Sequence, residues 1–222
     1  MNLSVFDVIG PVMVGPSSSH TAGAARLGLA ARRILGEPPL RAILGLHGSF
    51  AATGRGHATD RALLAGLLGL SPDDAALPRS PELAAEAGLR FEFEAIDLGE
   101  TAHPNTARLE LEGATARLCL LGSSLGGGIV EITEIDTYAT AFRGDFHTLV
   151  CWHEDRGGFL ARVTALLACV ELNIATLRTS RRGRGHDALT VIETDGPAPA
   201  DALGLFARLA GVRRLRALNP LP

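Results

Sequence analysis

Three consecutive serines followed by a histidine and a threonine form the stretch of this chain best suited to chemistry. They occupy residues 17–21, directly after Gly15-Pro16 and directly before an alanine-rich run with helical spacing. Unpaired backbone N–H groups and the positive end of the helix dipole meet at such a helix start. One serine is enough to cap a helix. The additional hydroxyls and the imidazole therefore indicate a place that holds an anion.

Three further segments combine polar residues with glycine. They are residues 47–60, which include His57; residues 103–106, which include His103 and Asn105; and residues 122–128. Taken singly, each also has a structural interpretation, as a helix cap, a hairpin turn or a tight turn. The last segment is not a dinucleotide-binding loop, because it lacks the G-x-G-x-x-G spacing and runs into a strand pattern.

Composition narrows the class of protein. The formal net charge is -3 over 222 residues, which removes a general electrostatic attraction to nucleic acid or to an anionic membrane. We find no apolar run of roughly 18 residues and no basic segment followed by an apolar core near the start. We therefore expect a cytoplasmic protein of one large or two small domains.

All 21 basic residues are arginines. A pyridoxal phosphate enzyme needs a lysine for its Schiff base, and a P-loop needs a lysine for its phosphates. Both kinds of chemistry are excluded for this chain.

The cysteines are Cys119, Cys151 and Cys169. They lie far apart, each between apolar neighbours, and none forms a C-x-x-C pair. This pattern predicts buried thiols in a reducing compartment. It also predicts that this chain ligates neither an iron–sulfur cluster nor a structural zinc ion.

Apolar periodicity predicts an α+β, two-layer domain with a mixed sheet over residues 1–145. The spacing predicts a helix over 22–35, a strand over 40–47, a helix over 58–68 and a short helix from Ser80. Alternating residues then predict a meander of four strands, centred near residues 92, 110, 119 and 133.

Residues 146–222 follow a second pattern. Strands are expected over 146–153, 174–182, 188–193 and 213–218, with helices over 157–173 and 201–209. The order βαββαβ matches the split βαβ, ferredoxin-like motif. Because so small a sheet commonly pairs with a second copy, we expect this unit to self-associate.

Taken together, these segments resemble the β chain of the iron–sulfur L-serine dehydratases. The motifs that carry the resemblance are residues 4–12 (SVFDVIGPV), 15–21 (GPSSSHT), 54–60 (G-x-GH-x-TD), 103–106 (HPNT) and 124–128 (S-x-GGG). The second unit resembles an ACT domain in residues 153–158 (HEDRGG) and 172–175 (LNIA). The resemblance covers essentially the whole chain.

The resemblance implies an enzyme subunit. Members of that family deaminate L-serine to pyruvate and ammonia without pyridoxal phosphate. They use a [4Fe-4S] cluster held by cysteines of a separate α chain or domain, and one iron acts as a Lewis acid on the serine hydroxyl. The first domain is similar to the allosteric substrate-binding domain of some phosphoglycerate dehydrogenases and is expected to dock on the α chain. We expect no activity from this chain alone.

The resemblance also assigns residues. The catalytic pair is His20 and His57; the substrate-binding residues are Ser18, Ser19, Thr21, His103 and Asn105; the effector-binding residues of the ACT domain are Asp155, Gly157, Gly158 and Asn173. His20 is either a proton-transfer group or a neutral donor that orients the substrate. Ala58 replaces a family glycine, and Arg156-Gly157 replaces the expected x-Pro pair, which loosens the effector loop.

Two other interpretations remain open. The chain is a non-catalytic module that senses serine, or it is a detached regulatory part of a phosphoglycerate dehydrogenase. The partner separates them: an α chain would carry cluster cysteines, whereas a dehydrogenase would carry G-x-G-x-x-G after a strand.

Overall fold

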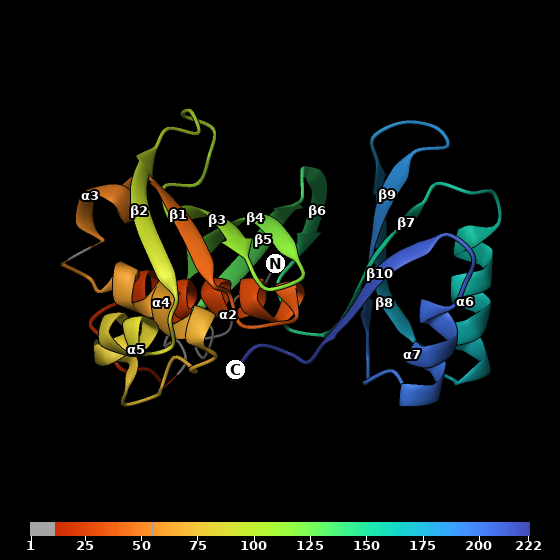
Figure 1. Ribbon diagram of the computed structural model, residues 1–222, viewed down its shortest axis with the longest axis horizontal. Coiled ribbons are helices and arrows are strands. Elements are labelled where there is room, and N and C mark those ends of the chain that lie inside the picture. Colours follow the sequence, from red (N-terminus) through yellow and green to blue (C-terminus); the bar gives the residue numbers. More distant parts are fainter. Residues whose placement is uncertain (1–11, 55) are drawn as a thin grey trace. The chain divides into compact units, whose positions relative to one another are not determined.

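The computed structural model describes residues 12–54 and 56–222 (Figure 1). The chain forms two compact units: unit 1 is Met1–Asp136 with Leu221–Pro222, and unit 2 is Thr137–Pro220. The motif at residues 4–12 lies outside the described residues except for Val12. The division falls between strands β5 (Ile129–Ile135) and β6 (Tyr138–Phe142), whereas the boundary expected at residue 146 falls after β6.

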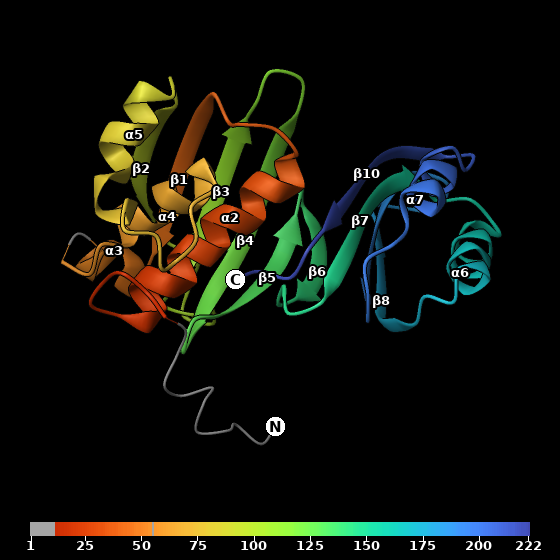
Figure 2. The ribbon, with the colours of Figure 1, turned by 90° about the horizontal axis from the view of Figure 1, so that it is seen from below.

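Unit 1 is a helical layer on a mixed sheet, as expected. Its elements are η1 (Ser18–Ala22), α2 (Gly23–Leu35), β1 (Arg41–His47), α3 (Ser49–Thr53), α4 (Thr59–Leu68), η2 (Leu77–Arg79), α5 (Ser80–Glu86), β2 (Arg90–Ile96), β3 (Thr106–Glu112), β4 (Arg117–Gly126) and β5. Within unit 1, the strands have the order β2-β1-β3-β4-β5. Helix α2 runs across one face of this sheet (Figure 2).

The strand order corrects the expected meander. Strand β1 lies between β2 and β3, parallel to β2 and antiparallel to β3. The parallel pair arises because α3, α4 and α5 form a crossover between β1 and β2. Helix α3 and strand β6 were not predicted, since each has only five residues. So short a segment gives little periodic signal.

Helices α2 and α4 pack through glycine. A methyl group on Gly28 would overlap the carbonyl oxygen of Leu63, and one on Gly66 would overlap that of Ala25. The missing side chains let the two backbones approach closely, and Ala25 and Leu63 are completely buried beside them. This contact positions the start of α2 against the sheet.

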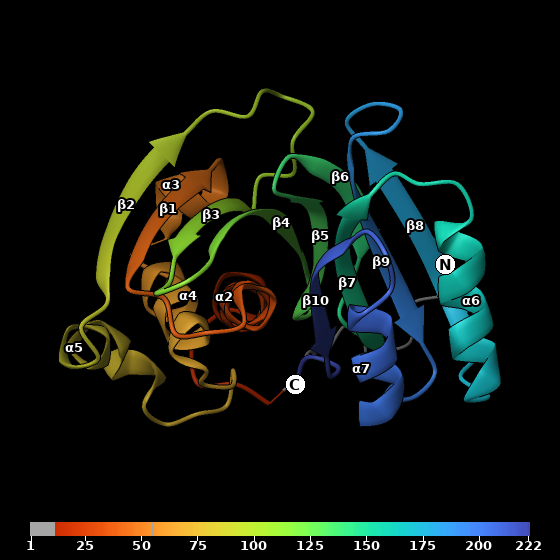
Figure 3. The ribbon, with the colours of Figure 1, turned by 45° about the vertical axis from the view of Figure 1, so that its right-hand side comes forward.

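Unit 2 has the expected βαββαβ order. It contains β7 (His147–Glu154), α6 (Phe159–Cys169), β8 (Ile174–Arg181), β9 (Asp187–Thr194), α7 (Ala200–Ala207) and β10 (Val212–Leu218). The strands are antiparallel in the order β10-β7-β9-β8. Both helices cover one sheet face (Figure 3), where Phe159 and Phe206 pack with Leu149, Cys151 and Ile192.

Helix α6 is shorter than the predicted 157–173. Gly158 adopts a left-handed conformation (φ 77°) just before it, and Glu171 does so (φ 54°) just after it. Helical backbone cannot continue through a left-handed residue. The apolar spacing from Phe159 onward continued past the point where the backbone turns.

The cysteines differ in exposure. Cys151 is buried, and burial raises the pKa of its thiol to about 12. Cys119 is half-buried, and Cys169, the last residue of α6, is exposed. The prediction of a buried thiol is therefore wrong for Cys169, because its apolar neighbours lie on a part of the helix that the sheet does not cover. Among the described residues, no helix is both long and apolar enough to span a membrane.

His153 is a buried titratable residue in the core of unit 2. The ring is 2% exposed and stacks on Phe159 with centroids 3.7 Å apart. Its Nδ1–H donates to the Glu154 carbonyl (2.8 Å), so Nε2 accepts from the Thr190 hydroxyl (2.7 Å). Burial lowers the pKa of His153 below its usual value, although Glu154 and Asp155 act in the opposite direction. The neutral ring is therefore part of the folded core.

We expect unit 2 to lose stability as the pH falls below about 6.5, because the unfolded chain takes up the proton first. The stabilisation is fully present above that pH. Urea unfolding at about pH 7.5 and about pH 5.5 measures the difference. His153→Gln removes the titrating ring and should therefore reduce this difference in the free energy of unfolding between the two pH values. An equal pH dependence in the variant would contradict the assignment.

Candidate active site

The four polar segments of the sequence meet at one edge of unit 1. Strand β1 ends at His47, β3 begins at Thr106, and Thr106 pairs with Ser123 near the end of β4. Because β3 runs antiparallel to both neighbours, these strand ends share one edge of the sheet. We call the residues that gather there the polar face. They are residues 17–21, 48–54, 57, 103–105 and 123–124.

The helix start contacts the segment after β1. The Nε2 atom of His20 lies 3.1 Å from the Ser49 hydroxyl and 3.1 Å from the Thr53 hydroxyl, both on α3. Thr21 donates its hydroxyl to the His57 carbonyl (3.1 Å). These bonds tie residues 17–21 to both ends of the segment that carries His57.

The other two segments complete the polar face. Phe50 N–H donates to the Pro104 carbonyl (3.4 Å), and Ser124 N–H donates to the Asn105 carbonyl (2.9 Å). Ser124 in turn packs directly on Gly23, where a methyl group would overlap its hydroxyl. Contacts thus run from the helix start through α3 and residues 103–105 to β4, and from β4 back to α2.

His20 is held as a neutral imidazole. It is 9% exposed, with its ring against Phe50 (centroids 5.3 Å apart, edge-on) and His57 (5.0 Å). Burial lowers the pKa of His20, the nearby His57 lowers it further, and a hydrogen bond with Ser49 partly offsets both. Its Nδ1 lies 3.2 Å from the Ser19 hydroxyl. Both ring nitrogens therefore contact hydroxyls, which donate or accept as required.

His57 is arranged differently. Its Nδ1 lies 3.2 Å from the Thr53 carbonyl oxygen. A carbonyl only accepts, so Nδ1 carries the proton and Nε2 of the neutral ring bears the lone pair. The side chain is half-buried, so this lone pair belongs to the more accessible histidine of the pair. Of the two, His57 has the geometry of a base.

The helix start is well formed. Ser17 is the N-cap of η1, and its hydroxyl accepts from the His20 N–H (3.3 Å). Ser18 and Ser19 occupy the first two positions, where N–H groups have no acceptor within the helix. Both side chains are half-buried. The predicted anion-holding groups are therefore confined to Ser18 and Ser19, because the N–H groups of His20 and Thr21 are bonded to Ser17.

Two buried polar atoms of the face have no hydrogen-bond partner among the described residues. They are Oδ1 of Asn105 and Oγ of Ser124. An unpaired buried polar atom costs about 1–3 kcal/mol, and such atoms are uncommon in folded proteins. Their presence beside the helix start indicates that the polar face has hydrogen-bonding capacity to spare.

Two expected substrate-binding residues have internal partners. Thr21 is completely buried and bonded to the His57 backbone, so it positions His57. His103 accepts the Asn105 N–H on Nδ1 (3.1 Å), which shapes the turn before β3. It also lines a hollow of about 400 Å³ with Leu98, Thr106 and Glu131.

The expected effector residues of unit 2 do not converge. Asp155 accepts from Arg181 (2.9 Å) and from Gly185 N–H (3.2 Å), and the Arg181 bond lowers the pKa of Asp155. Gly157 and Gly158 precede α6, whereas Asn173 follows it and donates to Asp195 (2.7 Å). Eleven helical residues, about 16 Å, separate the two groups.

Ser49, Phe50 and Thr53 are functional-site residues that were not predicted from the sequence. All three lie on α3, which brings them to His20. Ser49 and Thr53 are four residues apart and so share one helix face. That spacing was the only sign in the sequence that Ser49 and Thr53 could act together, and it is informative only if residues 49–53 are known to form a helix.

A family model matches most of unit 1. The model described as serine dehydratase beta chain matches residues 4–134, which contain the whole polar face. The chain belongs to the serine dehydratase beta chain family. The polar face is therefore the functional-site candidate of a member of this family.

Individual relatives agree. The chain is 41% identical to the "Probable L-serine dehydratase, beta chain" of Bacillus subtilis over 86% of this chain and 87% of that protein. It is 40% identical to the "L-serine dehydratase, beta chain" of Peptoniphilus asaccharolyticus over 95% and 94%, respectively. A more distant match is the "D-3-phosphoglycerate dehydrogenase" of Synechocystis, 25% identical over 59% of this chain but only 23% of that protein.

Proposed function

We propose that this chain is the β subunit of an L-serine ammonia-lyase that converts L-serine to pyruvate and ammonia. Membership of the serine dehydratase beta chain family supports the substrate and the existence of a partner subunit. The observation that carries the proposal is the paired His20 and His57 beside a helix start, with Nε2 of His57 left as an acceptor.

His57 is the proposed base. The reaction removes the α-proton and the β-hydroxyl of serine, and the resulting enamine hydrolyses to pyruvate and ammonia. Nε2 of His57 takes the α-proton, while the Thr53 carbonyl holds the opposite ring N–H and so keeps the lone pair on Nε2. Thr21 holds the His57 backbone in place.

His20 is the proposed orienting group. Both of its nitrogens are engaged by hydroxyls of Ser19, Ser49 and Thr53. Since its pKa is lowered, it stays neutral near pH 7 and places no positive charge beside His57. Of the two roles left open for His20, these contacts support orientation.

The substrate carboxylate is placed at the helix start. N–H groups of Ser18 and Ser19 point out of the first turn, and the helix dipole of η1 and α2 favours a negative charge there. Asn105 supplies an amide oxygen for the substrate ammonium, supported by its unpaired Oδ1. Carboxylate and ammonium would then fix the α-carbon beside His57.

A [4Fe-4S] cluster in the complete enzyme would polarise the serine hydroxyl as a Lewis acid. The cysteines of this chain do not fit such a group: Cys119 lies in β4, Cys151 in the core of unit 2 and Cys169 on an exposed helix end. Over residues 12–54 and 56–222, no three histidine, cysteine or acidic side chains form a metal-binding group. The proposal therefore assigns the cluster to a separate α chain.

Unit 2 is a proposed ACT domain. Its βαββαβ order and the glycine-rich turn before α6 support this assignment. An effector site that uses both Asp155 and Asn173 would not fit within a single copy, because the two residues lie at opposite ends of α6. Self-association of unit 2 is accordingly part of the proposal.

Reconstitution tests the proposed function. We expect the purified chain alone to release no pyruvate from L-serine, and to do so only when combined anaerobically with its α chain. Pyruvate and ammonia are measured together with iron in each fraction. Turnover by the chain alone would overturn the division of roles, and a fully assembled pair without turnover would overturn the lyase assignment.

The match to a phosphoglycerate dehydrogenase supports a second candidate function, in which this chain is a regulatory module of such an enzyme. The same purification separates the two. If the chain instead assembles with a dehydrogenase and changes its response to serine, the regulatory function replaces the lyase.

A further inference from the structure

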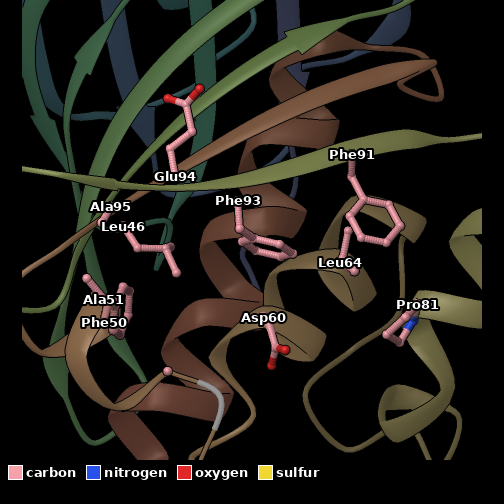
Figure 4. Close-up of a pocket in the computed structure, with 11 residues that line it drawn as sticks. Leu46, Phe50, Ala51, Asp60, Leu64, Pro81, Phe91, Phe93, Glu94 and Ala95 are labelled. Carbon is pink, nitrogen blue, oxygen red and sulfur yellow. The ribbon is translucent and has the colours of Figure 1, made fainter.

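An apolar groove lies beside the polar face, between strand β2 and helices α3, α4 and α5. Its volume is about 450 Å³. The side chains that form its walls are Leu46, Phe50, Leu64, Pro81, Phe91 and Phe93, which Figure 4 shows gathered below β2. None of the roles proposed above uses this groove.

Strand β2 offers a free edge next to the groove. It ends the strand order of its sheet, and all seven of its residues pair with β1 on the other side. No other strand among the described residues pairs with it. Edge strands commonly carry charged residues or proline; residues 90–96 contain no proline, and their charged residues, Arg90, Glu92 and Glu94, alternate with Phe91 and Phe93. Phe91 is 36% exposed on this strand.

One carboxylate faces the groove. Asp60, in the first turn of α4, lines it, whereas the Glu94 side chain points to the other side of β2 (Figure 4). Among the described residues, no arginine or histidine lines the groove. Asp60 belongs to the same 54–60 motif as His57, but the polar face does not use it. A carboxylate beside aromatic rings suits a cationic side chain on an apolar segment.

The groove is lined in part by helix α3, whose residues also contact His20. Phe50 and Gly54 line the groove, and the Phe50 ring contacts the His20 ring at 5.3 Å. Thr53, between them in sequence, bonds His20. Helix α3 thus has the groove on one side and His20 on the other.

We propose that an extended segment of the partner subunit occupies this groove. The segment adds a strand to the free edge of β2, inserts apolar side chains beside Phe91 and Phe93, and directs a lysine or arginine at Asp60. Its contact with α3 would hold Phe50 and Thr53 against His20. The inference rests on the proposed function, since it requires an α chain as partner.

Hydrogen exchange and binding measurements on the full chains test the groove. On complex formation, we expect backbone amides of residues 90–96 to exchange at least about tenfold more slowly. Phe91→Ala and Asp60→Asn should each weaken association with the α chain by about 5- to 100-fold, the range of buried interface anchors. Phe146→Ala, which changes a phenylalanine 42% exposed in unit 2, is the matched control and should leave the dissociation constant unchanged.

The outcomes separate the groove from the proposed function. An active complex in which residues 90–96 exchange as in the free chain, and in which both groove variants bind normally, overturns the groove and leaves the lyase assignment intact. Failure of any α chain to assemble with this chain overturns both. Weaker binding confined to the groove variants, with protection of β2, supports the inference.

Discussion

His57→Ala is expected to lower kcat of the reconstituted two-chain enzyme by on the order of 10²- to 10⁴-fold, the usual cost of losing a general base. The side chain is half-buried, and its loss removes the Nδ1–H bond to the Thr53 carbonyl and the ring contact with His20. The subunits should therefore still assemble. Steady-state kinetics with L-serine, together with the dissociation constant of the complex, measures both effects.

His20 provides the comparison for this result. As an orienting group, it should be replaceable in part: His20→Asn, which still bonds to the surrounding hydroxyls, should retain more activity than His20→Ala. An amide side chain accepts hydrogen bonds but is not basic enough to take up a proton. His57→Asn should therefore be as slow as His57→Ala. If His57→Ala keeps a near-normal kcat while both His20 variants lose activity, the two roles are exchanged.

Gly66→Val is expected to destabilise unit 1 by about 3 kcal/mol or more, at the upper end of overpacking effects. Even the first carbon of the new side chain would overlap the Ala25 carbonyl, and neither backbone can move without separating α2 from α4. Ser18 and Ser19 lie in η1, which runs directly into α2, so any folded fraction should also lose lyase activity. Urea unfolding followed by circular dichroism measures the loss.

Gly204→Ala is the matched control for this prediction. Gly204 also lies within a helix, α7, but nothing stands within 4 Å of the position that a methyl group would take. There, alanine should be neutral or should stabilise by up to about 1 kcal/mol through its higher helix propensity. Equal effects of the two substitutions would show that the close approach of α2 and α4 carries no special cost.

Much of the fold was readable from local pattern. The α2 and α4 spans, the strands other than β6 and the βαββαβ order follow from apolar periodicity and from glycine and proline positions, which act within a few residues. The parallel pairing of β1 with β2 was not readable. Strand neighbours are chosen by packing between segments distant in sequence, about which the alternation within one strand carries no information.

The site divides in the same way. Residue types alone singled out Ser17 to Thr21, His57, His103 and Asn105, and the absence of lysine excluded two kinds of cofactor chemistry. Only the tertiary structure decided which partners each histidine has: the Thr53 carbonyl leaves the lone pair of His57 on Nε2, whereas hydroxyls from α3 and Ser19 engage both nitrogens of His20. Proton positions depend on partners, and those partners come from a five-residue helix whose formation depends on contacts beyond its own sequence.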